Sequence, residues 1–374
     1  MSKILYLNQK LLSDPRLSTV LASYNYNWNQ FNKLTQLNPG NTGGYVRAGV
    51  NIYPLKNELI NQLNFQMPVY DSAFALSFSD VTDKQLMHLY QTRWNKRWLV
   101  LWSGGIDSTV IVASILKNLS PADRSNVDIA CNRISIYENP KFYYEHILPN
   151  FKLIDSNFLN LDDLLFEKYY VIDGEPADQL YGGIASRGMI DPNTVLKSWR
   201  NDPDELLDFF TNEVDRPFAE WYYESTKENI DSVTVPVETY YDFTWWLFFN
   251  MTWSSILLRP LHFQLSNSVD SLTSYFTNVI PYFNTIEYQL WSMTNRIGIK
   301  YNAGIGERKL ASKKYIYDFD HDEYYFCFKT KAQSVSRPTK SGRFFCILDD
   351  YTRLTLSNDL DQILELLPEH ISVR

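Results

Sequence analysis

The most constraining feature of this chain is a buried strand that runs into a glycine turn and then a helix. Residues 98–102 (WLVLW) are all large and apolar, which is typical of a parallel strand covered on both faces. The sequence SGGIDST follows at 103–109, and the mostly apolar residues 110–116 predict a buried helix after it. Glycines let the backbone approach a ligand closely, and a helix N-terminus supplies N–H donors and a positive dipole end. This arrangement favours a bound phosphate.

The glycine turn lacks the Gly-Lys-Ser/Thr ending of a Walker loop and the spacing of the dinucleotide pattern G-x-G-x-x-G. It resembles the PP-loop motif S-G-G-x-D-S of ATP pyrophosphatases, which cleave ATP to AMP and pyrophosphate. An ordinary glycine-rich connection in an α/β protein is the alternative. The resemblance implies that pyrophosphate would lie against the residues of the turn, namely Ser103, Gly104, Gly105, Ser108 and Thr109.

A second strand and turn of the same kind lie further along the chain. Residues 169–172 (YYVI) predict a core strand that runs directly into DGEPADQLYGG at 173–183. Two apolar strands that each end in a glycine-containing polar turn predict a site across the carboxyl ends of a parallel sheet. Mg²⁺ on a nucleotide is commonly held by one or two carboxylates, and Asp107 and Asp178 are the best pair for it. A helix-capping role is the alternative for each aspartate.

The second turn is similar to the S-G-E-G-x-D-E-L-F-G-G motif in the synthetase domain of asparagine synthetases, which β-lactam synthetases share. The resemblance implies that Asp178 is a Mg²⁺ ligand and that Gly174 belongs to the nucleotide site. It also implies that residues 133–136 (RISI) form a strand that lines the adenine pocket, with Ile136 in contact with the nucleotide. More weakly, residues 281–284 (PYFN) are similar to a P-F-L-D segment of the family.

Residues 329–331 (KTK) stand where the family has R-P-K. The resemblance implies that Lys331 matches the family lysine that stabilises the reaction at the adenylate. In an extended stretch, Lys329 and Lys331 would face the same side as Tyr325 and Cys327. A pair of solvated surface lysines is the alternative.

The chain departs from the family at several positions. Gln179 replaces a glutamate, Pro176 replaces a glycine, and the span between the second strand and the second motif is short. Because that span carries substrate-binding residues in the family, the family's amino-acid substrate cannot be transferred to this chain. Ser2 follows Met1 where a glutaminase domain would have its terminal cysteine, so ammonia or an amine is expected from elsewhere, such as a separate glutaminase.

Composition limits the remaining classes of function. The net charge of −8 gives no global basic field that would attract nucleic acid. A nucleic-acid partner is therefore not favoured. It stays open because one stretch without acids carries the basic residues Lys331, Arg337, Lys340 and Arg343. The widely spaced cysteines indicate neither a disulfide scaffold nor a zinc site and favour a cytoplasmic protein.

No membrane association is expected either. The most apolar window, residues 243–258, is too short to span a bilayer and predicts one buried helix. The first seven residues form too short an apolar run for a signal peptide.

The alternation of strands and helices predicts an α/β fold. With the resemblance, we expect a parallel sheet of the adenine nucleotide alpha hydrolase (PP-loop, Rossmann-like) type flanked by helices, a helical second half and a small N-terminal segment. Strands are expected at 127–137 and 152–154, a helix capped by Thr82, and a C-terminal hairpin at 344–356. The expected parts are an N-terminal segment of unknown role (1–94), the PP-loop domain (95–335) and a C-terminal hairpin and helix (336–374).

These features predict an enzyme that uses ATP and Mg²⁺ to adenylate a small-molecule carboxylate and transfers it to ammonia or an amine. The shortened span leaves two alternatives open. One is a PP-loop enzyme that modifies a nucleobase, free or in tRNA. The other is a nucleotide-binding protein that has lost turnover.

Overall fold

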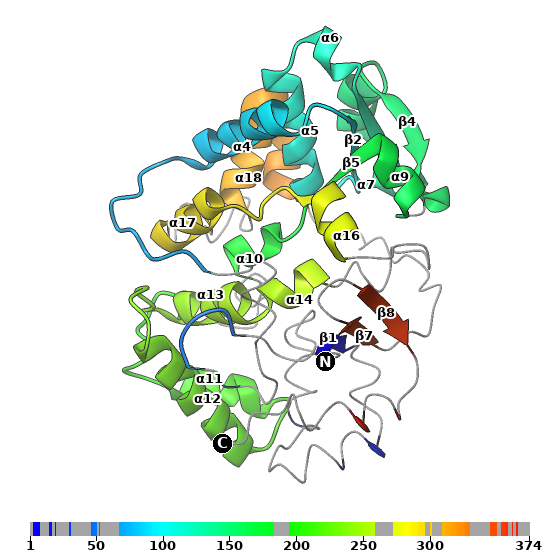
Figure 1. Ribbon diagram of the computed structural model, residues 1–374. Coiled ribbons are helices and arrows are strands. Elements are labelled where there is room, and N and C mark those ends of the chain that lie inside the picture. The colour runs from blue at the N-terminus through cyan, green and yellow to red at the C-terminus, as the bar shows by residue number, and fades with distance from the viewer. Residues whose placement is uncertain are drawn as a thin grey trace. The chain divides into compact units, whose positions relative to one another are not determined.

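The chain divides into two compact units, each built from segments that are distant in the sequence (Figure 1). Unit 1 comprises Met1–Tyr70, Asp178–Phe263 and Thr339–Arg374, and unit 2 comprises Asp71–Ala177 and Gln264–Pro338. The computed structural model describes residues 3–7, 15, 16, 19, 30, 46–50, 52, 67–159, 161–182, 194–258, 272–295, 300, 309–329, 345–349, 353–357, 361, 364 and 365.

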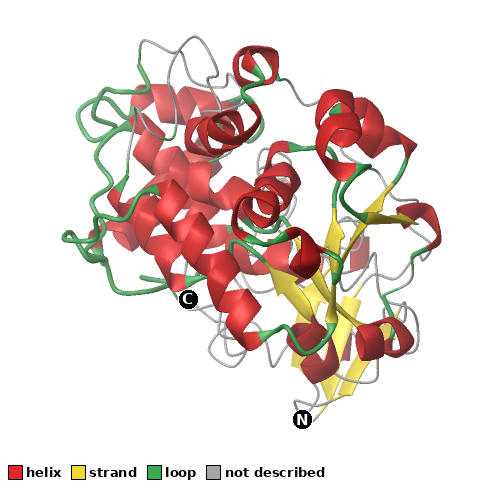
Figure 2. Cartoon of the chain, turned by 90° about the horizontal axis from the view of Figure 1, so that it is seen from above, coloured by secondary structure: helices red, strands yellow, loops and turns green. Residues whose placement is uncertain are grey.

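Unit 2 is built around a five-stranded sheet in the order β4-β3-β2-β5-β6, in which every neighbouring pair is parallel. This confirms the expected α/β class with a parallel sheet flanked by helices. Most of the regular structure that is described is helical (Figure 2). The strands are β2 (Arg97–Leu101), β3 (Val127–Cys131), β4 (Lys152–Asp155), β5 (Tyr169–Asp173) and β6 (Val279–Pro281).

The three middle strands of this sheet are covered on both faces. Every residue of β3 and β5 is buried, as the apolar runs predict for central parallel strands. Asp128 of β3 and Asp173 of β5 are the charged residues among them, and neighbouring strands satisfy the carboxylate of Asp128. Arg97 of β2 forms an ion pair with it, and the Tyr169 hydroxyl of β5 donates to Oδ2 at 2.7 Å. Because a buried carboxylate is stable only with such partners, this cluster favours the order β3-β2-β5.

Helices cover the sheet, and α5 packs on β2 while α9 packs on β5. Helices α4, α5 and α18 pack against one another (Figure 1). The helices that the structure describes wholly within unit 2 are α4 (Phe78–Thr92), α5 (Ile106–Asn118), α6 (Pro121–Arg124), α7 (Arg133–Glu138), α8 (Pro140–Phe142), the π-helix η1 (Tyr143–Ile147), the 3-10 helix η2 (Ser156–Phe158), α9 (Asp163–Lys168), α16 (Leu272–Asn278), α17 (Ile286–Thr294), α18 (Leu310–Asp320) and α19 (Glu323–Phe328).

Two local expectations for unit 2 are wrong. The strand expected at 127–137 ends at Cys131, because the Asn132 side chain accepts the N–H groups of Ile134 and Ser135 at 3.0 and 3.1 Å and starts helix α7. Helix α4 is capped by Ser77 rather than Thr82, through a capping box with Asp80.

Unit 1 contains further helices and a three-stranded sheet in the order β1-β7-β8, in which both pairs are antiparallel. The pairing of β7 with β8 confirms the expected C-terminal hairpin. The single helix expected at 243–258 is two helices that meet at Thr252. The elements are β1 (Lys3–Leu7), α11 (Asp204–Thr211), α12 (Arg216–Asp231), α13 (Tyr240–Met251), α14 (Trp253–Leu258), β7 (Phe345–Asp349) and β8 (Arg353–Ser357), and α10 (Ala177–Tyr181) begins at the last residue of a unit 2 segment.

Among the described residues, no helix has both the length and the apolar character needed to cross a bilayer. The helix expected near 360–367 falls largely outside the described residues.

Two buried asparagines organise unit 1. The Asn229 amide donates to the carbonyls of Ala48 and Val50 at 2.9 and 2.7 Å, and its oxygen accepts from Trp246 Nε1 at 2.8 Å. Asn250 donates to the Asn229 oxygen at 3.1 Å and accepts the Ala48 N–H at 2.9 Å. The two side chains therefore tie an early segment of the chain to helices α12 and α13.

We expect Asn229→Ala to lower the free energy of unfolding by about 3 kcal/mol, because two carbonyls and one indole N–H lose a buried partner. Urea unfolding followed by fluorescence measures the change. Asn201→Ala is the control, since its side chain is exposed, and we expect it to change stability by less than about 0.5 kcal/mol. Equal effects of the two substitutions would contradict the role assigned to Asn229.

Candidate functional site

The glycine turn lies between the carboxyl end of β2 and the start of α5. Two serines stabilise the turn by hydrogen bonds to its backbone. Ser108 Oγ accepts the Ser103 N–H at 3.1 Å, and Ser103 Oγ accepts the Gly105 N–H at 3.3 Å. Thr109 Oγ1 donates to the Gly105 carbonyl at 2.8 Å. Gly105 is the N-cap of α5 and provides no side-chain cap. The first N–H groups of α5 therefore have no capping side chain at the N-cap position, which suits an anion.

Two glycines are needed here because the backbone is closely packed. Gly104 has φ +76°, and a Cβ on it would overlap the Ser135 carbonyl and come within 2.7 Å of Glu138 Cβ. A Cβ on Gly174 would lie 3.0 Å from Asp107 Cβ and 3.4 Å from the Ser108 nitrogen. The turn after β5 thus packs directly on the first turn of α5. This confirms that the two glycine turns meet at the carboxyl edge of the sheet.

Asp107 forms a two-oxygen ion pair that the sequence did not predict. Lys309 Nζ lies 2.6 Å from Oδ1 and 2.5 Å from Oδ2 of Asp107. The side chains of Lys309 and Asp107 are 13% and 24% exposed. Lys309 stands directly before α18 with φ +53°, and no local motif marks it because its partner is 202 residues away. The N-cap position of α5 is held by Gly105, and Asp107 lies in the first turn of the helix.

A second ion pair lies beside Gly104 of the turn. Lys329 pairs with Glu138, whose side chain packs against Gly104, and also donates to the Glu138 carbonyl at 3.1 Å. Both side chains are less than a tenth exposed. Tyr325, which is fully buried, lies in helix α19, and burial raises the pKa of its hydroxyl. The extended stretch expected around Tyr325 and Cys327 is wrong, because α19 covers both.

The structure places the other predicted site residues as follows. Asp178 lies in the first turn of α10 and is exposed. It belongs to unit 1, whereas Asp107 belongs to unit 2. That the two residues share a cation therefore stays a prediction. Ile136 lies in helix α7 rather than in a strand, so the expected strand context of the adenine pocket is wrong. Pro281 ends β6, and the Tyr282 N–H donates to the Asp173 carbonyl at 3.0 Å. Lys331 lies outside the described residues.

The donors present fit a nucleotide that carries its own cation. Among the residues that the structure describes, no group of three or more His, Cys, Asp or Glu side chains is arranged to hold a metal. A Mg²⁺ ion bound to phosphates needs only one or two protein carboxylates, which Asp107 can supply. Gly104 and Gly174 pack against protein atoms, so the ligand donors of this edge are the N–H groups at the start of α5.

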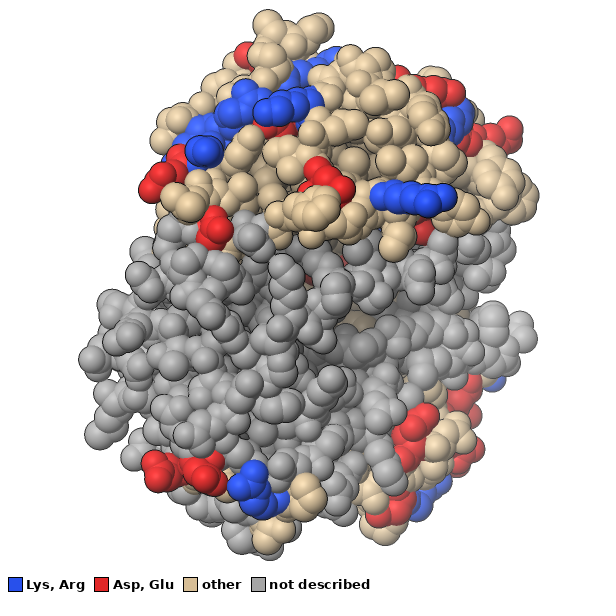
Figure 3. All heavy atoms as spheres, turned by 90° about the vertical axis from the view of Figure 1, so that its right-hand side faces the viewer, with Lys and Arg blue, Asp and Glu red and all other residues tan. Residues whose placement is uncertain are grey.

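Basic and acidic side chains are interspersed over the described residues of the face shown in Figure 3. The basic residues Arg337, Lys340 and Arg343 lie outside the described part of the chain.

Comparisons with protein-family models, with curated proteins and with solved structures found no match to this chain.

The two glycines of the turn should differ in their tolerance of a methyl group. We expect Gly104→Ala to lower the free energy of unfolding by about 2–4 kcal/mol, because of its positive φ and the overlap with Ser135 and Glu138. Gly105→Ala is the matched control. Its φ is −74° and the nearest atom to a Cβ is Ser103 Oγ at 3.2 Å, so we expect a change below about 1 kcal/mol. Thermal or urea unfolding compares the two, and a larger effect at Gly105 would contradict this geometry.

Proposed function

We propose that this chain is an ATP-dependent ligase of the PP-loop type that joins a carboxylate to ammonia or an amine. The observation that carries the proposal is the packing of Gly174 against Asp107 and Ser108. It brings two glycine turns to the N-terminus of α5 at the carboxyl edge of a parallel sheet, which is where open α/β sheets bind nucleotides. We propose also that the sheet is of the adenine nucleotide alpha hydrolase type.

In this proposal the turn at 103–109 binds the β- and γ-phosphates of ATP through backbone N–H groups and the hydroxyls of Ser103, Ser108 and Thr109. Asp107 and Asp178 would hold Mg²⁺, which neutralises charge on the leaving pyrophosphate. Asp107 must then exchange the Lys309 ammonium for the metal. The displaced ammonium remains beside the phosphates and adds a positive charge there.

The reaction proceeds in two substitutions. A substrate carboxylate oxygen attacks the α-phosphorus, the bond from that phosphorus to the bridging oxygen breaks, and pyrophosphate leaves. The nitrogen of ammonia or an amine then attacks the acyl carbon, the bond to AMP breaks, and the nitrogen loses a proton. Lys331 is proposed to stabilise the negative charge that develops at the adenylate.

A nucleotide-binding protein without turnover is the second candidate. The ion pair between Lys309 and Asp107 favours this candidate, because the Asp107 carboxylate already has a counter-ion from the chain itself. Binding of Mg-ATP without any release of AMP would support this candidate.

We expect purified protein with Mg-ATP and a metabolite extract to release AMP and pyrophosphate in equal amounts. Quantitative chromatography of nucleotides with an enzymatic pyrophosphate assay measures both products. ADP with inorganic phosphate would contradict the PP-loop chemistry. Release that requires added RNA would favour an enzyme that modifies a nucleobase in tRNA.

Neutralising either proposed metal ligand should stop the reaction. We expect Asp107→Asn and Asp178→Asn each to lower the rate of pyrophosphate release at least about 100-fold, because the metal contributes several kcal/mol of charge stabilisation. Asp318→Asn is the control, since Asp318 is an exposed residue paired with Lys314 at 2.9 Å. Normal turnover by either site variant would remove that residue from the metal site. Circular dichroism spectra establish that each variant is folded.

A further inference from the structure

Helix α18 is attached to its neighbours at two separated points. Lys309, directly before its first residue, pairs with Asp107 in the first turn of α5. Tyr315, six residues later, lies near Lys117 and Asn118 at the other end of α5. The second point of attachment is distant from the phosphate turn, because α5 separates the two ends by more than two helical turns.

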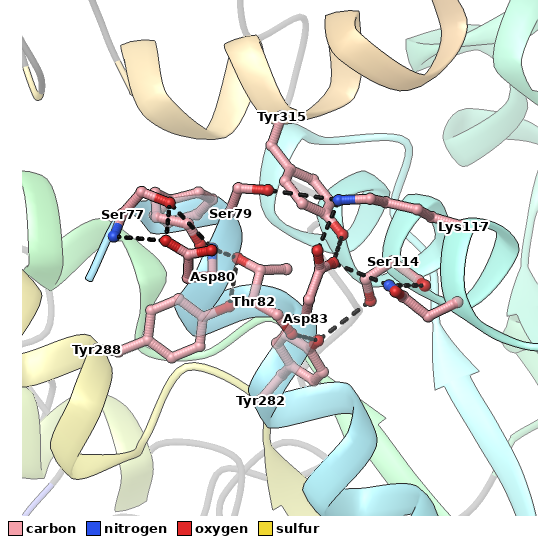
Figure 4. A network of polar contacts seen from close by, with 12 residues as sticks. Ser77, Ser79, Asp80, Thr82, Asp83, Ser114, Lys117, Tyr282, Tyr288 and Tyr315 are labelled. Carbon is pink, nitrogen blue, oxygen red and sulfur yellow. Dashed lines mark hydrogen bonds and ion pairs between the residues drawn. The ribbon is translucent and has the colours of Figure 1, made fainter.

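The second attachment is centred on the carboxylate of Asp83 in α4 (Figure 4). Its Oδ1 accepts the Tyr315 hydroxyl at 2.5 Å and the Asn118 amide at 2.8 Å. Its Oδ2 lies 2.6 Å from Lys117 Nζ. One carboxylate therefore joins α4, α5 and α18, and charge-assisted hydrogen bonds of this kind are about twice as strong as neutral ones.

Burial makes this attachment specific. The Tyr315 side chain is buried, and burial together with the Asp83 carboxylate raises the pKa of its hydroxyl, which therefore stays protonated and donates. Lys117 Nζ also lies 4.9 Å from the centre of the Tyr315 ring. A buried tyrosine hydroxyl that donates to a carboxylate fixes both the rotation and the axial position of the helix that carries it.

Helix α4 is itself held in place by the same network. The Tyr282 hydroxyl donates to the Thr82 carbonyl at 2.9 Å, and the Tyr288 hydroxyl donates to Thr82 Oγ1 at 2.9 Å. Ser114 of α5 lies 3.1 Å from the Tyr282 hydroxyl (Figure 4). Asp83 therefore lies on a helix that is held by several hydrogen bonds. The hydrogen bond between Asp83 and Tyr315 fixes the position of α18 relative to this helix.

We infer that Asp83 and Tyr315 are positioning residues that hold Lys309 against Asp107. Lysine has a long flexible side chain, so its ammonium stays at one carboxylate only if the backbone at its base is held. The Tyr315 side chain anchors α18 to both α4 and α5, through its hydrogen bond to Asp83 and the contact of its ring with Lys117. The effect on nucleotide binding rests on the proposed function, whereas the effect on Lys309 itself does not.

Acylation of lysine side-chain amines tests the inference without nucleotide, because an ammonium held in an ion pair must lose its proton before it reacts. The intact protein is labelled briefly with acetic anhydride, and mass spectrometry gives the rate at each lysine. We expect labelling of Lys309 to rise about fivefold in Tyr315→Phe and in Asp83→Asn, the ratio that corresponds to loss of one average hydrogen bond. Lys314, which is 65% exposed, should keep its rate in every variant. An unchanged rate at Lys309 in both folded variants would overturn the inference.

Tyr288→Phe is the matched control. It removes a buried hydroxyl of the same network, one that donates to Thr82 of α4. We expect the Lys309 labelling rate to stay at the wild-type value. A rise equal to that in Tyr315→Phe would show general loosening of unit 2 and would overturn a specific role for Tyr315.

A double-mutant cycle on Mg-ATP affinity tests the consequence for binding. We expect Tyr315→Phe to weaken binding about fivefold in the wild-type background and to have no further effect in a Lys309→Ala background. Equal weakening in both backgrounds would show that Tyr315 does not act through Lys309. If the wild-type protein binds no ATP, the proposed function fails, while the labelling result still decides the positioning role.

Discussion

The approach of the β5 turn to the first turn of α5 is the constraint on which the candidate site depends. Gly174 lies so close to Asp107 and Ser108 that a Cβ on it would come within 3.0 Å of Asp107 Cβ. Parallel pairing of β2 with β5 brings the two turns to the same edge of the sheet. Backbone donors and a carboxylate thus come together without any long side chain having to reach across.

Two lysines flank this turn and differ in their surroundings. The pair between Lys329 and Glu138 is almost completely buried, and removing one partner of such a pair leaves an uncompensated charge. The pair between Lys309 and Asp107 is more exposed, so its oxygens can exchange partners at lower cost. Helices α18 and α19 lie between the two lysines in sequence. The Lys329 end of this segment is therefore fixed, whereas the Lys309 end is suited to respond to a ligand.

The sequence predicted those parts of the fold that depend on local patterns. Residues 98–102 and 169–172 are apolar runs before glycine turns, and both are buried parallel strands. The strand expected to continue past Cys131 failed because one capping amide, Asn132, outweighed the apolar residues after it. Lys309 could not be found in this way, since its role depends on a partner brought near by the tertiary fold. The same holds for the contact of Tyr315 with Asp83.

The three-stranded sheet of unit 1 has a consequence for how the chain acquires its structure during synthesis. β1 pairs with β7, a strand that is synthesised long after β1. Closing so long a loop carries an entropic penalty that local contacts do not. The hairpin of β7 and β8 can form by itself once translated, whereas β1 must wait for it. Until then β1 presents unpaired backbone groups, which can pair with another chain.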